Sequence, residues 1–332
     1  MKTYIAIHGR EGGFAEKWIE FCERDKIAFK IVDCYSNEII SELNGVTHLL
    51  WHYHRWEVKN GSIANKLLTI FEQMGIKVFP NLITRVSFDE KIVQKYLLES
   101  IDAPMPKTTV FFEEQNAVNW IKDQKHLVFK LSKGAGSKNV KLVDFHEAKT
   151  LINRMFKSGF DSFNTSFPKF NTSFFYSLKR YFFRRLPLNS HQNKLVGKEY
   201  NYVYFQEFLP NNNHDIRIVT FRDKAIGLRR EVSKGSFKAS GSGLINYNPE
   251  VIPLDCIQKA FDVSAKLNFQ FMAYDFVLNS DKGYQIVEIC HGVSPRSYEK
   301  CEGYWDRELN FKRFKTAPII EEFILQDLIK EN

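Results

Sequence analysis

Short apolar runs alternate with helically spaced apolar residues over the first 80 residues of the chain. The apolar runs predict strands at residues 3–9, 28–34, 46–54 and 77–81. Between the first two strands, Ala15, Trp18 and Cys22 recur at helical spacing, and the segment 62–75 predicts a second helix. Strands that alternate with helices are typical of a parallel sheet with helices on its faces. The pattern therefore predicts an α/β domain at the N-terminus.

Beyond this part, apolar runs flank polar turns, a pattern that is typical of antiparallel hairpins. Hairpins are predicted at residues 127–143, 214–231 and 271–290. Ser87 is a favourable helix N-cap ahead of an amphipathic run, so a helix is predicted from that residue onward. A further helix is predicted at residues 254–268, directly before the last hairpin. The larger part of the chain should therefore be α+β.

The last hairpin carries a carboxylate in the middle of each apolar strand, Asp275 and Glu288. If the loop is Ser280–Gly283, the two side chains lie near one another on one face; a five-residue loop separates them unless a bulge intervenes. Two strand carboxylates that converge make a site for a hard divalent cation, usually Mg²⁺ with phosphate. The alternative is one carboxylate in solvent on an edge strand and the other in a structural salt bridge.

Two other segments are candidate ligand contacts. The turn of the hairpin at 127–143 contains Gly134, Gly136 and Ser137, whose backbone N–H groups are free to wrap anionic oxygens, with Lys130 nearby; a solvated hairpin tip is the alternative. A cluster of His52, His54 and Arg55 falls where the third strand ends. Ligands of open α/β sheets bind at the carboxyl ends of strands, so these side chains are substrate candidates. Packing and surface roles are the alternative.

Composition narrows the class of protein. The chain has 332 residues, 44% hydrophobic and 26% charged, which is ordinary for a globular protein, and its net charge of +8 suggests an anionic partner. Five cysteines without a C-x-x-C motif fit a reducing compartment, and no apolar run is long enough for a signal peptide or a membrane span. We expect a cytoplasmic protein. A basic, aromatic insertion at about 157–200 contains an amphipathic stretch, 170–186, that would either contact the inner membrane face or an acidic glycan, or pack on its own domain.

The order of the motifs resembles the ATP-grasp superfamily. In sequence they are a lysine ahead of a helix, a strand lysine with a glycine-rich hairpin, and then "QEFL", "DIR", "RRE", "FKASGSG", "YDFV" and "VEIC". The resemblance runs from about Asn81 to about Pro295. It implies an α/β N-terminal domain plus α+β ATP-grasp domains, with ATP held between two antiparallel sheets. The implied divisions are residues 1–83, a connecting helix at 84–104, a small lobe at 105–203 and a catalytic lobe at 204–332.

The resemblance also implies roles for individual residues. ATP would be held by the two lysines, the glycine-rich loop, an adenine hinge and an acid at the ribose: Lys91, Lys130, Gly134, Gly136, Ser137, Glu207, Phe208, Leu209 and Asp215. The groups near the transferred phosphate would be Arg217, Arg230 and Lys238, with Ser240 as a substrate candidate. The implied Mg²⁺ ligands are Asp275 and Glu288. Many family members have Asn where this chain has Cys290, and a neutral thiol is a poor ligand for Mg²⁺.

The implied activity is an ATP- and Mg²⁺-dependent carboxylate–amine ligase that works through an acylphosphate. The sequence near the C-terminus is similar to ATP-grasp proteins of bacterial surface-polysaccharide clusters, so a carboxylated sugar is the expected acceptor and an amino acid or amine the donor. No nucleic acid partner is expected. The alternatives are an ATP-grasp kinase that phosphorylates a hydroxyl and a non-catalytic protein that binds a polyanion or a membrane.

Overall fold

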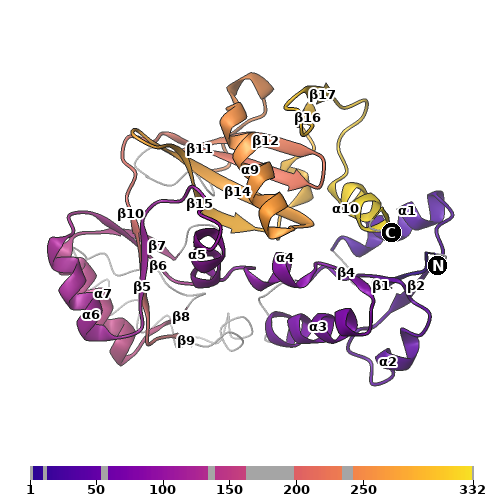
Figure 1. Ribbon diagram of the computed structural model, residues 1–332, viewed down its shortest axis with the longest axis horizontal. Coiled ribbons are helices and arrows are strands. Elements are labelled where there is room, and N and C mark those ends of the chain that lie inside the picture. Colours follow the sequence, from indigo (N-terminus) through magenta and orange to yellow (C-terminus); the bar gives the residue numbers. More distant parts are fainter. Residues whose placement is uncertain are drawn as a thin grey trace, which may run out of the picture.

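The computed structural model describes residues 3–9, 13–53, 59–133, 139–161, 198–233 and 242–330. The N-terminal sheet has four parallel strands in the order β2–β1–β3–β4, with bounds Phe29–Val32, Ile5–His8, His48–Leu50 and Lys77–Phe79. Helices α1 (Ala15–Arg24), α2 (Ile39–Glu42) and α3 (Asn65–Gln73) connect the strands, and a π-helical turn, Lys59–Ala64, precedes α3. The predicted parallel sheet with covering helices is confirmed (Figure 1).

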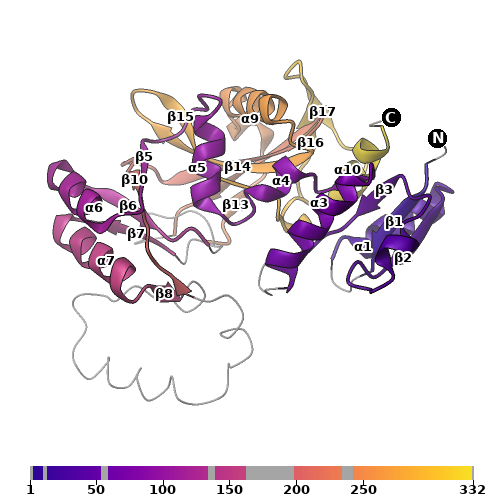
Figure 2. The same ribbon diagram turned by 60° about the horizontal axis from the view of Figure 1, so that its bottom comes forward.

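A second sheet is antiparallel and has the order β5–β10–β6–β7, with bounds Thr108–Phe111, Val203–Glu207, Leu127–Lys130 and Val140–Val143. Helices α6 (Glu114–Trp120) and α7 (Phe145–Lys157) cover one face of this sheet, where Phe129, Leu151 and Phe205 share a buried cluster (Figure 2). A short ribbon of β8 (Phe160–Asp161) and β9 (Lys198–Glu199) flanks it. The opposite face carries Lys130 and Gln206.

The third sheet is the largest. Its strands run β15–β14–β11–β12–β16–β17, with bounds Gly283–Cys290, Phe271–Asn279, His214–Phe221, Ala225–Glu231, Gly303–Trp305 and Phe311–Arg313, and β13 (Ile245–Asn246) pairs with β12. Helix α9 (Leu254–Leu267) covers one face, where Phe261 packs with Ile216 and Tyr274. Three predicted elements, the hairpins at 127–143 and 214–231 and the helix at 254–268, are therefore present.

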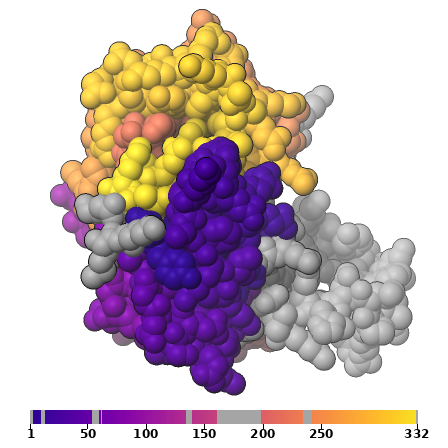
Figure 3. All heavy atoms as spheres, turned by 90° about the vertical axis from the view of Figure 1, so that its right-hand side faces the viewer, coloured from indigo at the N-terminus to yellow at the C-terminus, as the bar shows by residue number. Residues whose placement is uncertain are grey.

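The other face of the large sheet divides into two halves. One half is apolar: Phe221 and Ala273 pack with helices α1 and α10 (Ile320–Ile329), and Trp18 on α1 donates to the Glu321 carbonyl at 3.0 Å. The C-terminal residues accordingly lie against the N-terminal ones in Figure 3. The other half of this face is polar and holds the candidate site. No helix in the described ranges is both long and apolar enough to cross a membrane.

The predicted helix start at Ser87 is wrong. Helix α5 spans Lys91–Glu99, and Ser87 instead follows a separate helix, α4 (Leu82–Val86). Asn81 caps α4, because its side chain accepts a hydrogen bond from Thr84 N at 3.0 Å. The positive φ of Asp89, 50°, then turns the chain before α5 begins. The break places Lys91 in the first turn of α5, facing the site.

In the last hairpin Asp275 is paired with Glu288, as predicted, but the loop is not the predicted one. Its loop is one residue shorter than Ser280–Gly283, because Gly283 already pairs with Asn279 at a φ of 74°. A β-bulge next to Asp275 then leaves Val287 without a ladder partner and brings Glu288 opposite Asp275. The two carboxylates therefore share one face, as the sequence predicts, but a bulge sets the register.

Candidate active site

Strand register gathers five charged side chains on one face of the large sheet. Arg217 pairs with Asp275, and Asp275 pairs with Glu288 on the other side. Asp215 is two residues before Arg217 on β11 and pairs with Arg230 on β12. Residues that face each other across strands, or that are two apart along a strand, point to the same side of a sheet. The cluster therefore follows from the alternation of side chains once the strands are paired.

Asp275 lies between two arginines. Arg217 donates to it twice, at 2.6 and 3.1 Å, and Arg230 Nη2 lies 2.8 Å from Asp275 Oδ2. Burial alone would raise the pKa of the Asp275 carboxyl, but the two guanidinium groups outweigh burial and hold this pKa below its usual value. Asp275 is therefore ionised at neutral pH, and both arginines are anchored beside it.

Asp215 forms a second bidentate pair. Arg230 donates to its two oxygens at 2.7 and 2.6 Å, and the Asp215 side chain is buried. Burial raises the pKa of Asp215 and Asp275 raises it further, against the opposing effect of Arg230. The structure thus places Asp215 against an arginine. The ribose contact stays a prediction, and in this arrangement the visible effect of Asp215 is to orient Arg230.

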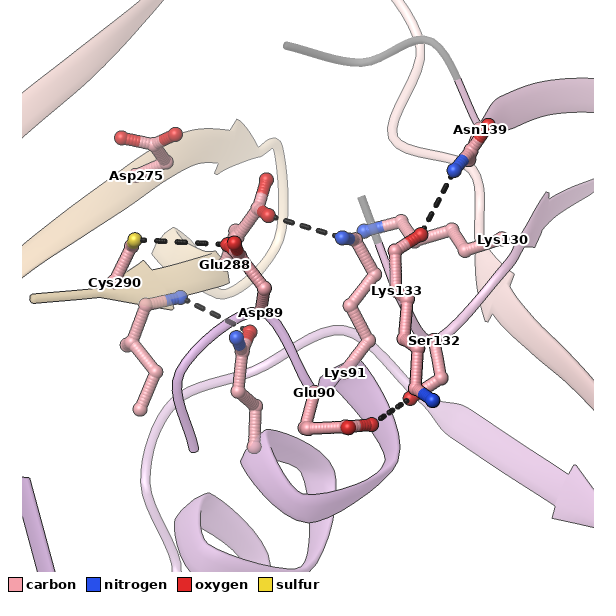
Figure 4. Close-up of polar contacts among 12 residues, drawn as sticks. Asp89, Glu90, Lys91, Lys130, Ser132, Lys133, Asn139, Asp275, Glu288 and Cys290 are labelled. Carbon is pink, nitrogen blue, oxygen red and sulfur yellow. Dashed lines mark hydrogen bonds and ion pairs between the residues drawn. The ribbon is translucent and has the colours of Figure 1, made fainter. Parts of the chain in front are cut away.

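Two buried lysines, Lys91 on α5 and Lys130 on β6, approach the hairpin of β14 and β15 (Figure 4). Lys91 Nζ lies 3.1 Å from Glu288 Oε1. Lys130 Nζ donates to Gln206 Oε1 at 2.7 Å and to the carbonyl of Val287 at 3.0 Å. That carbonyl belongs to the bulged residue, so the bulge both aligns Glu288 and offers an acceptor to Lys130. The two lysines therefore connect the β5–β10–β6–β7 sheet and helix α5 to the large sheet.

The two lysines differ in their titration. Burial lowers the pKa of Lys130 to about 8, and Lys91 lowers it as well, against the opposing effect of Glu288. Burial would also lower the pKa of Lys91, but Glu288 and Asp89 outweigh burial and raise it. Glu288 thus acts on both buried lysines, and for Lys130 it does not outweigh burial. Anionic oxygens placed between the lysines would favour the charged form of Lys130.

The root of the glycine-rich hairpin is tied to the start of α5 by a small polar network. The backbone N–H of Lys91 donates to the Ser132 carbonyl at 3.1 Å, and Ser132 Oγ lies 3.1 Å from Glu90 Oε2, as Figure 4 shows. Asn139 closes the base of the hairpin by donating to the Lys133 carbonyl at 2.8 Å. These contacts fix the positions of Lys91 and Lys130 relative to one another.

The predicted adenine hinge connects the two antiparallel sheets. Glu207 ends β10, and Phe208 and Leu209 begin the connection to β11. Glu207 is exposed, its backbone N–H donates to the Lys107 carbonyl at 2.8 Å, and Leu209 is buried. An exposed strand end between two sheets is a suitable edge for a purine, but the adenine contact stays a prediction.

The oxygen ligands suit Mg²⁺ better than the sulfur does. Asp275 and Glu288 present hard carboxylate oxygens on one face, whereas burial raises the pKa of the Cys290 thiol well above its usual value. Cys290 Sγ points toward Asp89 Oδ1, 3.9 Å away (Figure 4). Across the described ranges, no group of three or more His, Cys, Asp or Glu side chains could hold a metal ion alone. The two carboxylates therefore fit a metal that phosphate oxygens help to bind, and Cys290 does not.

Several predicted residues lie away from the cluster or outside the described residues. The His52 ring stacks on Phe14, with centroids 3.8 Å apart, in the N-terminal domain. The remaining predicted contacts and the basic stretch 170–186 fall outside the described ranges; these residues are His54, Arg55, Gly134, Gly136, Ser137, Lys238 and Ser240. Their roles stay predictions.

Sequence reasoning missed two polar groups at the site. Gln206, beside the hinge residue Glu207, accepts from Lys130 and donates to Thr108 Oγ1 at 3.0 Å. Alternation along β10 places it on the inner face of the small sheet, and that alternation is readable from the sequence. Tyr298 is buried, and the charges of both arginines act on the pKa of its hydroxyl. No local pattern marks it, because it follows the last site strand in an irregular segment.

The comparisons with known proteins agree with this geometry. No protein-family model matches the chain. Among curated proteins, the chain is 23% identical over 271 residues to the alpha-aminoadipate–LysW ligase LysX of Saccharolobus solfataricus. The matched region covers 80% of this chain and 85% of LysX. Among solved structures, the D-alanine–D-alanine ligase from Bacillus anthracis is similar with a TM-score of 0.57 and 13% identity, over 99% of this chain and 96% of that one.

The ATP-grasp ligase PsnB, complexed with a minimal precursor, is similar with a TM-score of 0.57 and 11% identity over the whole of both chains. A second PsnB structure contains the minimal precursor, Mg and ADP; its TM-score is 0.55, with 10% identity over 99% of both chains. The chain therefore has the ATP-grasp fold, as the resemblance of its motifs implies. The bound Mg and ADP in PsnB agree with the predicted ATP and Mg²⁺.

Proposed function

We propose that the protein is an ATP- and Mg²⁺-dependent ligase that activates a carboxylate and joins it to an amine. The observation that carries the proposal is the meeting of Lys91, Lys130 and Glu288 between two antiparallel sheets, beside the cluster of Arg217, Arg230 and Asp275. Phosphoryl transfer needs positioned groups and neutralised oxygens more than it needs a nucleophilic side chain. The two lysines and the two arginines are the positioned cations that could neutralise phosphate oxygens at this site.

Each group has a role in this proposal. Lys91 and Lys130 bind the phosphates of ATP, and the Val287 carbonyl and Gln206 hold Lys130 in place. Asp275 and Glu288 would hold Mg²⁺, which would supply positive charge to the phosphate oxygens. Arg217 and Arg230 hold the oxygens of the transferred group, and Asp215 orients Arg230.

The reaction then proceeds in two steps. A carboxylate oxygen of the acceptor attacks the γ-phosphorus, the bond to ADP breaks, and an acylphosphate forms. The amine nitrogen attacks the acyl carbon, phosphate leaves with the bonding electron pair, and the nitrogen loses a proton. The buried cations would stabilise the charge on both leaving groups. We propose a carboxylated sugar of a surface polysaccharide as the acceptor, on the basis of the C-terminal sequence resemblance.

The test is ATP turnover with product identification. The protein is incubated with ATP, Mg²⁺ and pools of acidic sugars, amino acids and amines, and phosphate release and mass spectra are recorded. ADP, free phosphate and an amide support the ligase. A stable phosphomonoester without free phosphate supports the kinase instead, and a protein that neither binds MgATP nor turns it over has neither activity.

A matched pair of variants ties turnover to the site. Asp275→Asn should abolish Mg²⁺-dependent turnover. Glu231→Gln is the control, because Glu231 is also a strand carboxylate paired with an arginine, Arg229, at 2.7 Å, but it lies on the opposite face of β12. Equal activity in both variants would contradict the assignment of the site.

A further inference from the structure

The hydroxyl of Tyr298 is buried without a hydrogen-bond partner among the residues that the structure describes. Tyr298 follows the short turn of 3-10 helix Pro295–Ser297, and its side chain is 1% exposed. Buried hydroxyls in folded proteins nearly always find a partner, because a polar group that leaves water without a new hydrogen bond costs stability. This hydroxyl therefore needs an acceptor other than the described residues, either an ordered water or a ligand.

Tyr298 lies where the apolar half of the sheet face meets the polar half. Its ring belongs to the same buried cluster as Val219 and Ala273. Val219 is two residues beyond Arg217 on β11, and Ala273 is two residues before Asp275 on β14, so these four side chains stand on one face. Tyr298 thus belongs to the buried cluster of the apolar half, whose strands continue directly into the arginine–aspartate cluster.

The charged groups of the cluster act on the Tyr298 hydroxyl. Burial raises its pKa most, and Asp275 raises the pKa further, against the opposing effects of Arg217 and Arg230. A tyrosine hydroxyl is protonated at neutral pH in any case, because its ordinary pKa is about 10, so it can donate a hydrogen bond. Its neighbours Arg217 and Arg230 are donors too, so the three groups could share one acceptor that carries negative charge.

We propose that Tyr298 binds an oxyanion of the reaction: its hydroxyl donates to an oxygen of the phosphate group held by Arg217 and Arg230. A phosphate has enough lone pairs to accept from a hydroxyl and from guanidinium groups together. Binding would give the hydroxyl an acceptor that the described residues do not supply. This inference rests on the proposed function, since it places the transferred phosphoryl group beside the two arginines.

The test uses inorganic phosphate as the probe. Phosphate is titrated by calorimetry into the full-length protein saturated with MgADP. Tyr298→Phe should weaken phosphate binding about tenfold or more, because a hydrogen bond to a charged acceptor is lost, and should leave the affinity for MgADP unchanged. The matched control is Tyr274→Phe, because the Tyr274 hydroxyl is also buried but lies 2.5 Å from Ser264 Oγ on the opposite face.

Stability separates a binding role from a structural one. Tyr298→Phe removes a hydroxyl that has no hydrogen-bond partner among the described residues, so its free energy of unfolding should equal or exceed that of the wild type. Tyr274→Phe should lower the free energy of unfolding and leave phosphate binding unchanged. The inference is overturned if Tyr298→Phe binds phosphate as tightly as the wild type, or if the wild type binds MgADP but no phosphate. Failure of the wild type to bind MgADP would overturn the proposed function as well.

Discussion

Lys130 should titrate near pH 8 in the ligand-free protein, more than two units below an ordinary lysine. Its side chain is 5% exposed, and burial is the main cause of the shift from 10.5 to about 8. A shift of this size corresponds to roughly 3 kcal/mol of differential stability between the charged and neutral forms. The folded protein bears this cost in full wherever both states are protonated, which is below about pH 8.

The sign of the pH dependence follows from the proton count. Between pH 8 and 10.5 the unfolded chain keeps the Lys130 proton while the folded protein loses it, so the unfolded state binds more protons. The free energy of unfolding therefore rises with pH in this window. Lys130→Met has no such group, so the wild type should gain roughly 3 kcal/mol relative to this variant between pH 8 and 10.5.

Two measurements check this prediction. Urea unfolding of the wild type and of Lys130→Met across this pH range gives the difference in slope. NMR of the lysine side chains labelled with ¹³C at Cε gives the titration midpoint directly, and the variant identifies the resonance of Lys130. Lys91 is an internal comparison, because its pKa is raised. A midpoint for Lys130 at or above 10.5, or equal pH slopes in the two proteins, would refute the reasoning.

Other predictions concern the site and the scaffold. Glu288→Gln should lower the Lys130 pKa below about 8, because the Glu288 charge now raises it, and the same NMR titration measures the change. MgATP binding at pH 9 should take up about one proton, since phosphates favour the charged form of Lys130, and calorimetry in buffers of different ionisation enthalpy counts it; no uptake would contradict the phosphate contact. Arg85→Met should cost about 3 kcal/mol in urea unfolding, because the buried guanidinium binds Glu72 at 2.7 Å and the Pro80 carbonyl at 3.0 Å. Gly303→Ala should destabilise the β16–β17 hairpin and lower the melting temperature, because a Cβ there would lie 2.2 Å from the Lys312 carbonyl oxygen.

Local patterns in the sequence were sufficient to predict the hairpins that carry the site. The apolar residues around Asp275 and Glu288 marked both carboxylates as unusual. These inferences hold because a strand has a period of two and a buried charge is costly, and both facts are local. The order of the motifs along the chain was sufficient for the ATP-grasp fold.

How these groups meet depends on the packing of the elements in three dimensions. The bulge at Val287, the start of α5 at Lys91 and the pairing of Asp215 with Arg230 depend on contacts between segments that are far apart in sequence. Tyr298 likewise joins the buried cluster beside the site from a turn whose local sequence carries no such signal. Local sequence preferences are too weak to fix the bulge, the helix start or the ion pair. The energies that fix them come from burial and charge neutralisation between packed elements. The same burial sets the pKa values on which the proposed chemistry depends.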